Sequence, residues 1–239
     1  MTLPLEGARA LVTGASRGIG EAVARALAGA GASVALVAKN GEQLDRVASS
    51  LGRRAFAVPC DLFDPSEIDR AIHAAGAALG GPPGILVNSA GIFPFAPLHV
   101  LGADEFAAAM TVNVVAPFRL IRALLGSMLE AREGHVVSIG SVADRNAFPE
   151  NGAYAASKFG ARAMHEVLRV ETRGTGVRAT LIAPGPVNTA MWEKVANAAR
   201  TDLPGPSAML GPDDVAAAVL FAIMQPTTVN VDELRLSRS

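Results

Sequence analysis

"ARALVTGASRGIGEAVARALAGAG", residues 8–31, joins three patterns that predict how the chain begins to fold. "ARALVTG" (8–14) is a short apolar run that ends in glycine, which predicts a buried strand. "GIGEAVARALAGAG" (18–31) has apolar residues at helical spacing and a terminal glycine, which predicts a helix. Glycines between the two predict a tight turn. A strand, a glycine turn and a helix in this order favour an α/β protein.

The rest of the chain repeats the alternation of strand and helix. Further strands are expected at residues 33–38, 55–62, 84–91, 135–141, 177–185 and 229–236. Helices are expected at 40–52, 64–79, 103–131, 153–174 and, capped by Asp213, at 213–224. This alternation implies right-handed crossovers and a parallel sheet that is covered on both faces. We predict one α/β domain, residues 1–239, built on a Rossmann-type doubly wound parallel sheet of about seven strands, with a candidate lid at 190–212.

Composition narrows the class of protein. Half of the 239 residues are hydrophobic and the formal net charge is −1, so the chain has ample material for a core. No basic stripe favours nucleic acid, and no apolar run approaches the ~20 residues of a membrane span. The single cysteine, Cys60, excludes an internal disulfide, and the sequence has no metal-ligand spacing. We therefore expect a cytoplasmic protein with no nucleic-acid, membrane or metal partner.

The turn "TGASRGIG" (13–20) has the composition of a phosphate-binding loop. Glycine permits a close approach of the backbone to a pyrophosphate, which then lies at a helix N-terminus. The spacing is G-x-x-x-G-x-G, not the G-x-G-x-x-G of the common dinucleotide fingerprint. A turn of small residues for packing is the alternative. The place of this turn between the first strand and the first helix favours a nucleotide.

Two cations favour NADP over NAD. An acidic residue that binds the ribose 2′-hydroxyl of NAD is expected near the end of the second strand. That strand ends instead in "VAKN" (37–40), where Lys39 offers a positive charge, and Arg17 in the glycine turn offers another. For each residue alone, a solvated surface charge is the alternative. Together the two suit the extra phosphate of NADP.

"AYAASKFGA" (153–161) contains Tyr154, the only tyrosine of the chain, and Lys158, one of few lysines. Positions i and i+4 share one helix face, so the two side chains can act at one site. An adjacent ammonium lowers the pKa of a phenol because it favours the phenolate. Such a pair is typical of a proton donor and acceptor for a carbonyl that is reduced by hydride. A packing tyrosine and a solvated lysine are the alternative.

These residues resemble the short-chain dehydrogenase/reductase family over nearly the whole chain. "TGASRGIG" is similar to the family's T-G-x-x-x-G-x-G loop, and "YAASK" (154–158) to its Y-x-x-x-K motif. "NSAG" (88–91) is similar to its N-N-A-G segment, and "PGPVNT" (184–189) to its P-G-x-V-x-T segment. These motifs occur in the family's order, which makes the resemblance much stronger than any one of them.

The resemblance implies four catalytic residues: Tyr154, Lys158, Ser141 and Asn113. Ser141 stands 13 residues before Tyr154, at the family's spacing, and Asn113 matches the family's helix asparagine. Tyr154 would be the general acid in reduction and the base in oxidation, with Lys158 lowering its pKa and binding the nicotinamide ribose. Ser141 would donate to the substrate oxygen, and Asn113 would position a water between Lys158 and solvent. A turn or cap for Ser141 and a local hydrogen bond for Asn113 are the alternatives.

The resemblance also implies which residues bind the cofactor, NADP(H), with NAD(H) as the less favoured alternative. Asp61 and the Leu62 backbone would contact the adenine, and Thr189 would hold the pyrophosphate and carboxamide. The full set is Gly14, Ser16, Arg17, Gly18, Ile19, Gly20, Lys39, Asp61, Leu62, Asn88, Ala90, Gly91, Tyr154, Lys158, Pro184, Gly185, Val187 and Thr189. Many members are tetramers joined through two long helices, so we expect a homo-oligomer, either a tetramer or a dimer.

Three features depart from the family's pattern. Ser89 replaces the second asparagine of N-N-A-G, and Gly140 stands where a second serine is common. The C-terminus, "TTVNVDELRLSRS" (227–239), lacks the VDGG-type ending of many members, including 3-oxoacyl carrier-protein reductases. It is more similar to a subgroup of shorter carbonyl reductases and 3-hydroxy-acid dehydrogenases.

Substrate residues are expected in the loops after the fourth, fifth and sixth strands. Besides Ser141, the candidates are Ile92, Phe93, Phe95, Arg145, Asn146, Phe148, Met191 and Trp192. Packing under a loop or against a partner subunit is the alternative for the aromatic ones. The favoured function is an NADP(H)-dependent oxidoreductase that interconverts a ketone and a secondary alcohol. A 3-oxoacyl-thioester reductase and a non-catalytic NADP-binding sensor are the alternatives, and the sequence specifies neither the natural substrate nor the direction.

Overall fold

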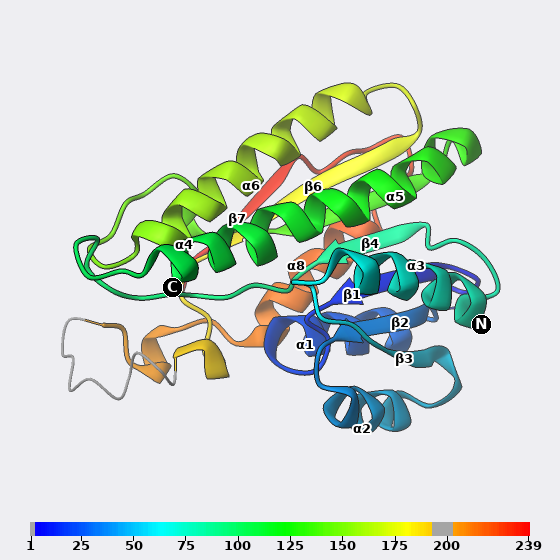
Figure 1. The fold of residues 1–239 in the computed structure, drawn as a ribbon. Helices are drawn as coiled ribbons and strands as arrows, with labels where there is room; N and C mark the ends of the chain where they lie inside the picture. Colours follow the sequence, from blue (N-terminus) through cyan, green and yellow to red (C-terminus); the bar gives the residue numbers. More distant parts are fainter. Residues whose placement is uncertain (1–2, 193–202) are drawn as a thin grey trace.

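The computed structural model describes residues 3–192 and 203–239, and a parallel β-sheet lies at its centre (Figure 1). Its strands are β1 (Arg9–Thr13), β2 (Ser33–Ala38), β3 (Ala55–Pro59), β4 (Ile85–Asn88), β5 (Gly134–Ile139), β6 (Val177–Pro184) and β7 (Glu233–Leu236). The strand order is β3-β2-β1-β4-β5-β6-β7, and every neighbouring pair is parallel. This confirms the predicted Rossmann-type, seven-stranded sheet.

Strand β1 shows why the apolar runs become strands. Ala10, Leu11 and Val12 have no exposed surface, because helices cover both faces of a parallel sheet. β1 lies between β2 and β4, with Val12 beside Leu36 on one side and Val87 on the other. The strand order reverses between β1 and β4, and ligands bind in the crevice outside the carboxyl ends of the strands at such a point.

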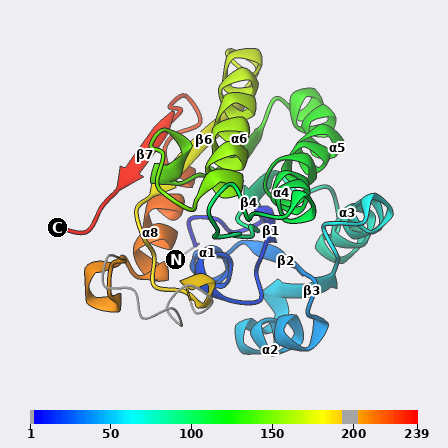
Figure 2. The ribbon, with the colours of Figure 1, turned by 60° about the vertical axis from the view of Figure 1, so that its left-hand side comes forward.

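The helices form two layers, one on each face of the sheet (Figures 1 and 2). Helices α1 (Gly18–Gly29), α2 (Gly41–Leu51) and α8 (Pro212–Ile223) pack into one hydrophobic cluster. Helices α3 (Pro65–Leu79), α5 (Ala116–Ala131) and α6 (Gly152–Glu171) pack into the other, and α4 (Ala103–Met110) lies against α6. Short 3₁₀ turns are η1 (Gly52–Arg54), η3 (Val142–Asp144), η4 (Ala190–Trp192) and η5 (Pro206–Ala208). The two layers leave the carboxyl ends of the strands as the place for a site.

Two boundaries near the C-terminus differ from the prediction. Helix α8 is capped by Gly211 and not by Asp213, because the carboxylate of Asp214 accepts a 2.7 Å hydrogen bond from the Gly211 amide. Strand β7 is shorter than predicted, because the side chain of Asn230 takes the place of a strand neighbour. Its amide oxygen and nitrogen bind the backbone N–H and C=O of Ala179 at 2.9 and 3.0 Å.

The predicted helix 103–131 is interrupted by a π-helical turn, η2 (Thr111–Val115), between α4 and α5. Single π turns inside α-helices are frequent at functional sites. By length and mean hydropathy, 1.4, this run does meet the requirement for a membrane span, contrary to the expectation from the sequence. However, its buried side chains, among them Leu120, Leu124 and Met128, belong to the core cluster. A single apolar helix that packs in this way is weak support for a span.

Two buried histidines predict a loss of stability in acid. His135 bonds Thr180 at 2.8 Å and His165 bonds Ser138 at 3.0 Å. Burial lowers the pKa of His135 to about 3 and that of His165 to about 4. The folded protein therefore keeps both rings neutral, while the unfolded chain takes up protons near pH 6.5. Stability that is present at pH 7 should fall below pH 6.5, by about 1.4 kcal/mol per pH unit for each ring.

Urea unfolding at pH 7 and pH 5 measures this loss. His165→Gln should reduce the difference in unfolding free energy between the two pH values by about 2 kcal/mol. His73→Gln is the matched control, because His73 is exposed. Equal pH dependence in the wild type and in His165→Gln would contradict the prediction.

Candidate active site

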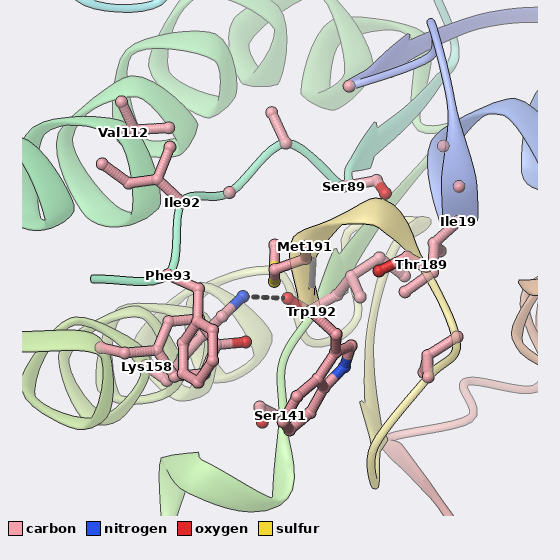
Figure 3. Close-up of a pocket in the computed structure, with 18 of the residues that line it drawn as sticks. Ile19, Ser89, Ile92, Phe93, Val112, Ser141, Lys158, Thr189, Met191 and Trp192 are labelled. Atoms are coloured by element: carbon pink, nitrogen blue, oxygen red, sulfur yellow. Dashed lines mark hydrogen bonds between the residues drawn. The ribbon is translucent and has the colours of Figure 1, made fainter. Parts of the chain in front are cut away.

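A cleft of about 770 Å³ opens where the strands end, in the size range of ligand sites (Figure 3). Its walls come from the segments that follow β1 to β6. The predicted residues that line it are Gly14, Ser16, Arg17, Gly18, Ile19, Gly20, Lys39, Asp61, Leu62, Ala90, Gly91, Ile92, Phe93, Phe95, Ser141, Phe148, Tyr154, Lys158, Pro184, Gly185, Val187, Thr189, Met191 and Trp192. Four predicted site residues, Asn88, Asn113, Arg145 and Asn146, do not line it.

The glycine turn is built for a close approach of backbone to backbone. Gly14 has φ +68°, and a Cβ there would lie 2.9 Å from the Cα of Ala90. A Cβ on Gly20 would lie 2.3 Å from the carbonyl oxygen of Gly14. Arg17, the N-cap of α1, forms no side-chain cap, and the first turn of the helix lines the cleft. Backbone N–H groups of an uncapped helix start suit a pyrophosphate, so the residues present fit a dinucleotide.

Thr13 joins the glycine turn to the loop after β4. Its hydroxyl oxygen accepts hydrogen bonds from the N–H groups of Ser89 and Ala90, both at 3.0 Å. It donates to the carbonyl oxygen of Val87 at 3.4 Å. Asn88 itself is buried beneath this loop and forms no side-chain hydrogen bond within residues 3–192 and 203–239. The hydrogen bonds at position 89 come from the backbone, so they do not depend on whether serine or asparagine stands there.

Lys39 and Asp61 face each other at the far end of the cleft. The Lys39 ammonium lies 2.6 Å from the Asp61 carboxylate, and the lysine side chain is 77% exposed. This hydrogen bond lowers the pKa of Asp61 and raises that of Lys39. Asp61 also accepts from the amide of Phe63 at 3.1 Å. The side chain predicted to hold a 2′-phosphate is therefore paired with the carboxylate predicted to contact the adenine.

Tyr154, Lys158 and Ser141 meet in the cleft as predicted. Tyr154 and Lys158 come from one face of α6, with the ammonium 5.6 Å from the centre of the phenol ring. The Lys158 ammonium also donates to the carbonyl oxygen of Ile139 at 2.8 Å. Ser141 caps the turn η3, accepting from the Ala143 amide at 3.1 Å, and its hydroxyl bonds the Tyr154 side chain. The cap role and the site role of Ser141 therefore coexist.

The electrostatics of this pair differ from the expectation. Burial raises the pKa of Tyr154 to about 12; the hydrogen bond with Ser141 opposes the rise and the charge of Asp144 adds to it. Burial lowers the pKa of Lys158 to about 8. The lysine therefore does not bring the tyrosine pKa below its ordinary value in this structure, because the cost of desolvating a phenolate is larger. At neutral pH the phenol holds its proton.

Asn113 lies in the π turn η2 behind the cleft, and its amide is fully engaged. Its oxygen accepts from the Ile92 amide at 2.9 Å, and its nitrogen donates to the Ile92 carbonyl at 3.0 Å and to the Ser157 hydroxyl at 2.9 Å. Ser157 donates in turn to the carbonyl oxygen of Tyr154 at 2.7 Å. Asn113 thus ties the loop after β4 to helix α6 beside the tyrosine. Sequence reasoning missed Ser157, because a serine within a helix carries no distinct signal.

A cluster of aromatic side chains lies on one side of the tyrosine. Phe93 packs edge-on against Tyr154, with ring centres 4.7 Å apart, and lies 5.6 Å from both Phe95 and Trp192. Figure 3 shows Phe93, Lys158, Met191 and Trp192 among the side chains that line the cleft. The cleft wall near the tyrosine is therefore mainly apolar.

The prediction that Arg145 binds substrate is not supported by its position. The guanidinium bonds Asp144 at 2.7 Å and also bonds Glu233, and the residue lies outside the cleft lining. The cleft contains instead Asn151, a buried residue three positions before Tyr154, which sequence reasoning did not single out.

The predicted lid, 190–212, is described only in part, since residues 193–202 lie outside the described residues. Leu203 and Pro204 line the cleft. The amide of Leu210 donates to the Pro186 carbonyl at 2.9 Å, which anchors the end of the segment beside the cleft. Closure of this segment over a substrate remains a prediction.

Comparison with known proteins assigns the family. A family model described as short chain dehydrogenase matches residues 8–200. An uncharacterized oxidoreductase of Staphylococcus aureus is 36% identical over 226 residues, which cover 94% of each protein. The glycine betaine reductase of Emericella nidulans is 36% identical over 237 residues, or 97% of this chain, but the chain spans only 19% of that protein's length.

Solved structures share the fold across almost the whole chain. A metagenomic short-chain oxidoreductase in complex with NADP is 34% identical, with a TM-score of 0.83 and coverage of 99% of this chain and 100% of that one. A 3-ketoacyl-(acyl-carrier-protein) reductase from Brucella melitensis, complexed with NADH, is 27% identical, with a TM-score of 0.86 and coverage of 97% of both chains.

The parallel sheet, the glycine turn and the cleft at the strand ends are those of a dinucleotide-binding α/β fold, and the matched family model makes the chain an oxidoreductase. The chain belongs to the short-chain dehydrogenase/reductase family.

Proposed function

We propose that this oxidoreductase uses NADP(H) to interconvert a ketone and a secondary alcohol. The observation that carries the proposal is the meeting of the Tyr154 phenol, the Ser141 hydroxyl and the Lys158 ammonium in one cleft with the glycine turn. When bound, the nicotinamide supplies the hydride. Side chains of the protein donate and accept the proton.

Tyr154 is the proposed proton donor in the direction of reduction. Because its pKa is raised to about 12, the phenol keeps its proton at neutral pH and gives it to the substrate oxygen as the O–H bond of the alcohol forms. Ser141 donates a hydrogen bond to the same oxygen. Lys158, with a pKa of about 8, is mainly charged at pH 7, and its charge compensates the phenolate until solvent returns a proton.

Asn113 is proposed to position this machinery. Its hydrogen bonds to Ile92 and Ser157 hold the loop after β4 against α6. The water that Asn113 would place beside Lys158, as the family resemblance implies, stays part of this proposal.

The proposed substrate is an apolar ketone or alcohol. The rings of Phe93, Phe95 and Trp192 and the side chain of Met191 line the cleft beside Tyr154. Apolar walls with few polar groups favour substrates whose carbonyl carries aliphatic or aromatic substituents. The engagement of Arg145 by two carboxylates argues against a carboxylate held by that residue.

NADP is favoured over NAD by two cations that line the cleft beyond the first and second strands. Arg17 is exposed, and Lys39 is exposed apart from its pairing with Asp61. A 2′-phosphate would bring negative charge between these side chains. The NADP complex of the metagenomic relative supports this choice, whereas the NADH complex of the Brucella reductase shows that the fold accepts either cofactor.

Lys39→Gln tests the preference. Loss of a charged hydrogen bond to the phosphate should weaken NADPH binding by about tenfold or more, and NADH binding by less than about twofold. Fluorescence titration with each cofactor measures both constants. Arg53→Gln is the matched control, because it removes an exposed cation that does not line the cleft. Equal weakening of both cofactors in Lys39→Gln would count against a phosphate contact.

The function itself is tested by following NADPH and NADH oxidation at ~340 nm against ketones of graded polarity and 3-oxo esters. We expect turnover of apolar ketones, faster with NADPH. Tight NADPH binding without turnover of any member would contradict the proposal and favour a non-catalytic sensor.

A 3-oxoacyl-thioester reductase is the second candidate. The fold match to the Brucella reductase favours it. A kcat/KM for a 3-oxoacyl thioester well above the value for simple ketones would favour this candidate over a ketone reductase.

We also propose a cytoplasmic homo-oligomer, a tetramer or a dimer. The continuous run of α4, η2 and α5 lies beside α6 on one face of the molecule (Figures 1 and 2). They expose Phe106, Phe118, Phe159, Val167 and Val170, each at least 40% accessible. Apolar surface on neighbouring helices favours contact with another subunit. Light scattering that gives a monomer mass would contradict this.

A further inference from the structure

Two features that differ from the family's pattern, Gly140 and the C-terminal segment, lie close to the proposed catalytic residues. Gly140 stands directly after β5, and its amide donates to the Ile182 carbonyl at 2.7 Å. A Cβ at this position would lie 2.9 Å from the Oδ2 atom of Asp144. A serine at position 140 would therefore crowd the carboxylate of Asp144. Glycine at 140 leaves the space in which this carboxylate lies.

Asp144 is a fully buried carboxylate with one charged partner. Its side chain has no exposed surface, and its Oδ1 accepts from the Arg145 guanidinium at 2.7 Å. Its Oδ2 forms no hydrogen bond within the described part of the chain. Burying a carboxylate is costly unless a positive charge stays close to it, so Arg145 must be held firmly in place.

The C-terminal segment that differs from the family's common ending fixes the position of the Arg145 side chain. The guanidinium of Arg145 also donates to Glu233, the first residue of β7. Glu233 belongs to "VNVDELRL", the segment that replaces the more common ending. Two carboxylates thus face one guanidinium, and the cluster of Asp144, Arg145 and Glu233 keeps a net negative charge.

This cluster adjoins Ser141, one of the proposed catalytic residues. The Asp144 amide donates to the Ser141 carbonyl at 3.0 Å, so Asp144 closes the short turn η3 that Ser141 caps. The negative charge of Asp144 raises the pKa of both Tyr154 and Lys158. Ser141 opposes this at Tyr154 through its hydrogen bond. In both residues burial is the larger influence, and Asp144 is the charged group that acts on the two together.

We propose that Asp144, anchored through Arg145 to Glu233 of β7, is a positioning residue that keeps the proton on Tyr154 and the charge on Lys158. A nearby anion disfavours a phenolate and favours an ammonium, so one carboxylate biases both groups toward the form needed for reduction, adding to the effect of burial at Tyr154 and opposing it at Lys158. The C-terminal strand thereby becomes part of the catalytic apparatus. The catalytic meaning of this charge rests on the proposed function, but the charge itself can be measured without turnover.

The test uses the low number of tyrosines and lysines. The only tyrosine gives a single ¹³Cζ resonance, and the few lysines give resolvable ¹³Cε resonances, in the cofactor-free full chain. Titration by NMR then follows Tyr154 and Lys158 directly, with circular dichroism at each pH to confirm that the chain is folded. The variants are Asp144→Asn and Glu233→Gln. Asp232→Asn is the matched control, because Asp232 precedes Glu233 in the same C-terminal segment but pairs with Arg169 of α6 and not with Arg145.

Asp144→Asn should lower the titration midpoints of both residues by up to about one pH unit, the order expected when one charge that acts on a buried group is removed. Glu233→Gln should shift both in the same direction by a smaller amount, and Asp232→Asn should shift neither. Unchanged midpoints in Asp144→Asn would overturn the proposal. If Asp144→Asn does not fold, Glu233→Gln decides in the same way, since this residue is partly exposed.

Kinetics separate this proposal from the proposed function. With a ketone that the wild type reduces, the alkaline fall in kcat/KM should move to lower pH in Asp144→Asn but not in Asp232→Asn. A wild type without turnover would refute the proposed function and leave the NMR test intact. Turnover with identical pH profiles and identical midpoints in all variants would refute the positioning role alone.

Discussion

Tyr154→Phe is expected to lower kcat for ketone reduction by about 10²–10⁴-fold, the range that a general acid contributes. Only the hydroxyl is lost. The phenylalanine ring can keep the edge-on contact with Phe93, whose centre lies 4.7 Å from that of the tyrosine. The dissociation constant for NADPH should therefore stay within about twofold of the wild-type value. Initial rates at saturating substrate and a fluorescence titration with NADPH measure the two quantities.

The combination of the two results is what tests the role of Tyr154. Loss of turnover together with loss of NADPH binding would indicate a damaged cleft and not a missing proton donor. Wild-type turnover in Tyr154→Phe would refute the role assigned to this residue. An unchanged melting temperature serves as the control for folding.

Gly20→Ala is expected to weaken cofactor binding by about tenfold or more, because moving the turn would misplace the backbone N–H groups that meet the pyrophosphate. The new Cβ would lie 2.3 Å from the carbonyl oxygen and 2.6 Å from the carbonyl carbon of Gly14, and 2.9 Å from the carbonyl oxygen of Thr13. These neighbours are backbone atoms, so the turn itself must move. Titration with NADPH measures the effect.

Gly29→Ala is the matched control, at the other end of the same helix. A Cβ at Gly29 would meet no atom within 4 Å, and the glycine does not have a positive φ. Alanine there should leave NADPH binding unchanged and stabilise the helix by up to about 1 kcal/mol. Equal NADPH affinity in Gly20→Ala and the wild type would show that the turn does not require glycine at position 20.

The features predictable from the sequence are those that depend on local pattern. Central strands such as β1 are buried on both faces, so they read as continuous apolar runs. Asp64 and Pro65 begin α3 where a helix was predicted, and the Asp64 carboxylate accepts from the Ser66 amide at 2.8 Å. Tyr154 and Lys158 are one turn apart on a helix, so their meeting follows from spacing alone. Each of these signals lies within a few residues.

The features that escaped prediction join residues that are distant in sequence. Arg145 and Glu233 are 88 positions apart, and no local pattern distinguishes this arginine from one that faces the substrate. The pairing of Lys39 with Asp61 depends in the same way on β2 and β3 being neighbours. The raised pKa of Tyr154 results from burial by the assembled cleft, whereas the adjacent lysine alone predicts a lowered one.

The central claim is that the Tyr154 hydroxyl exchanges a proton with the substrate oxygen. The most direct measurement is a crystal structure of the full chain with NADP⁺ and a bound alcohol that the enzyme oxidises. We predict that the Tyr154 Oη atom lies about 2.6–3.2 Å from the alcohol oxygen, with the Ser141 hydroxyl bonded to the same oxygen. An alcohol oxygen more than about 5 Å from Tyr154, with no water between them, would contradict the account.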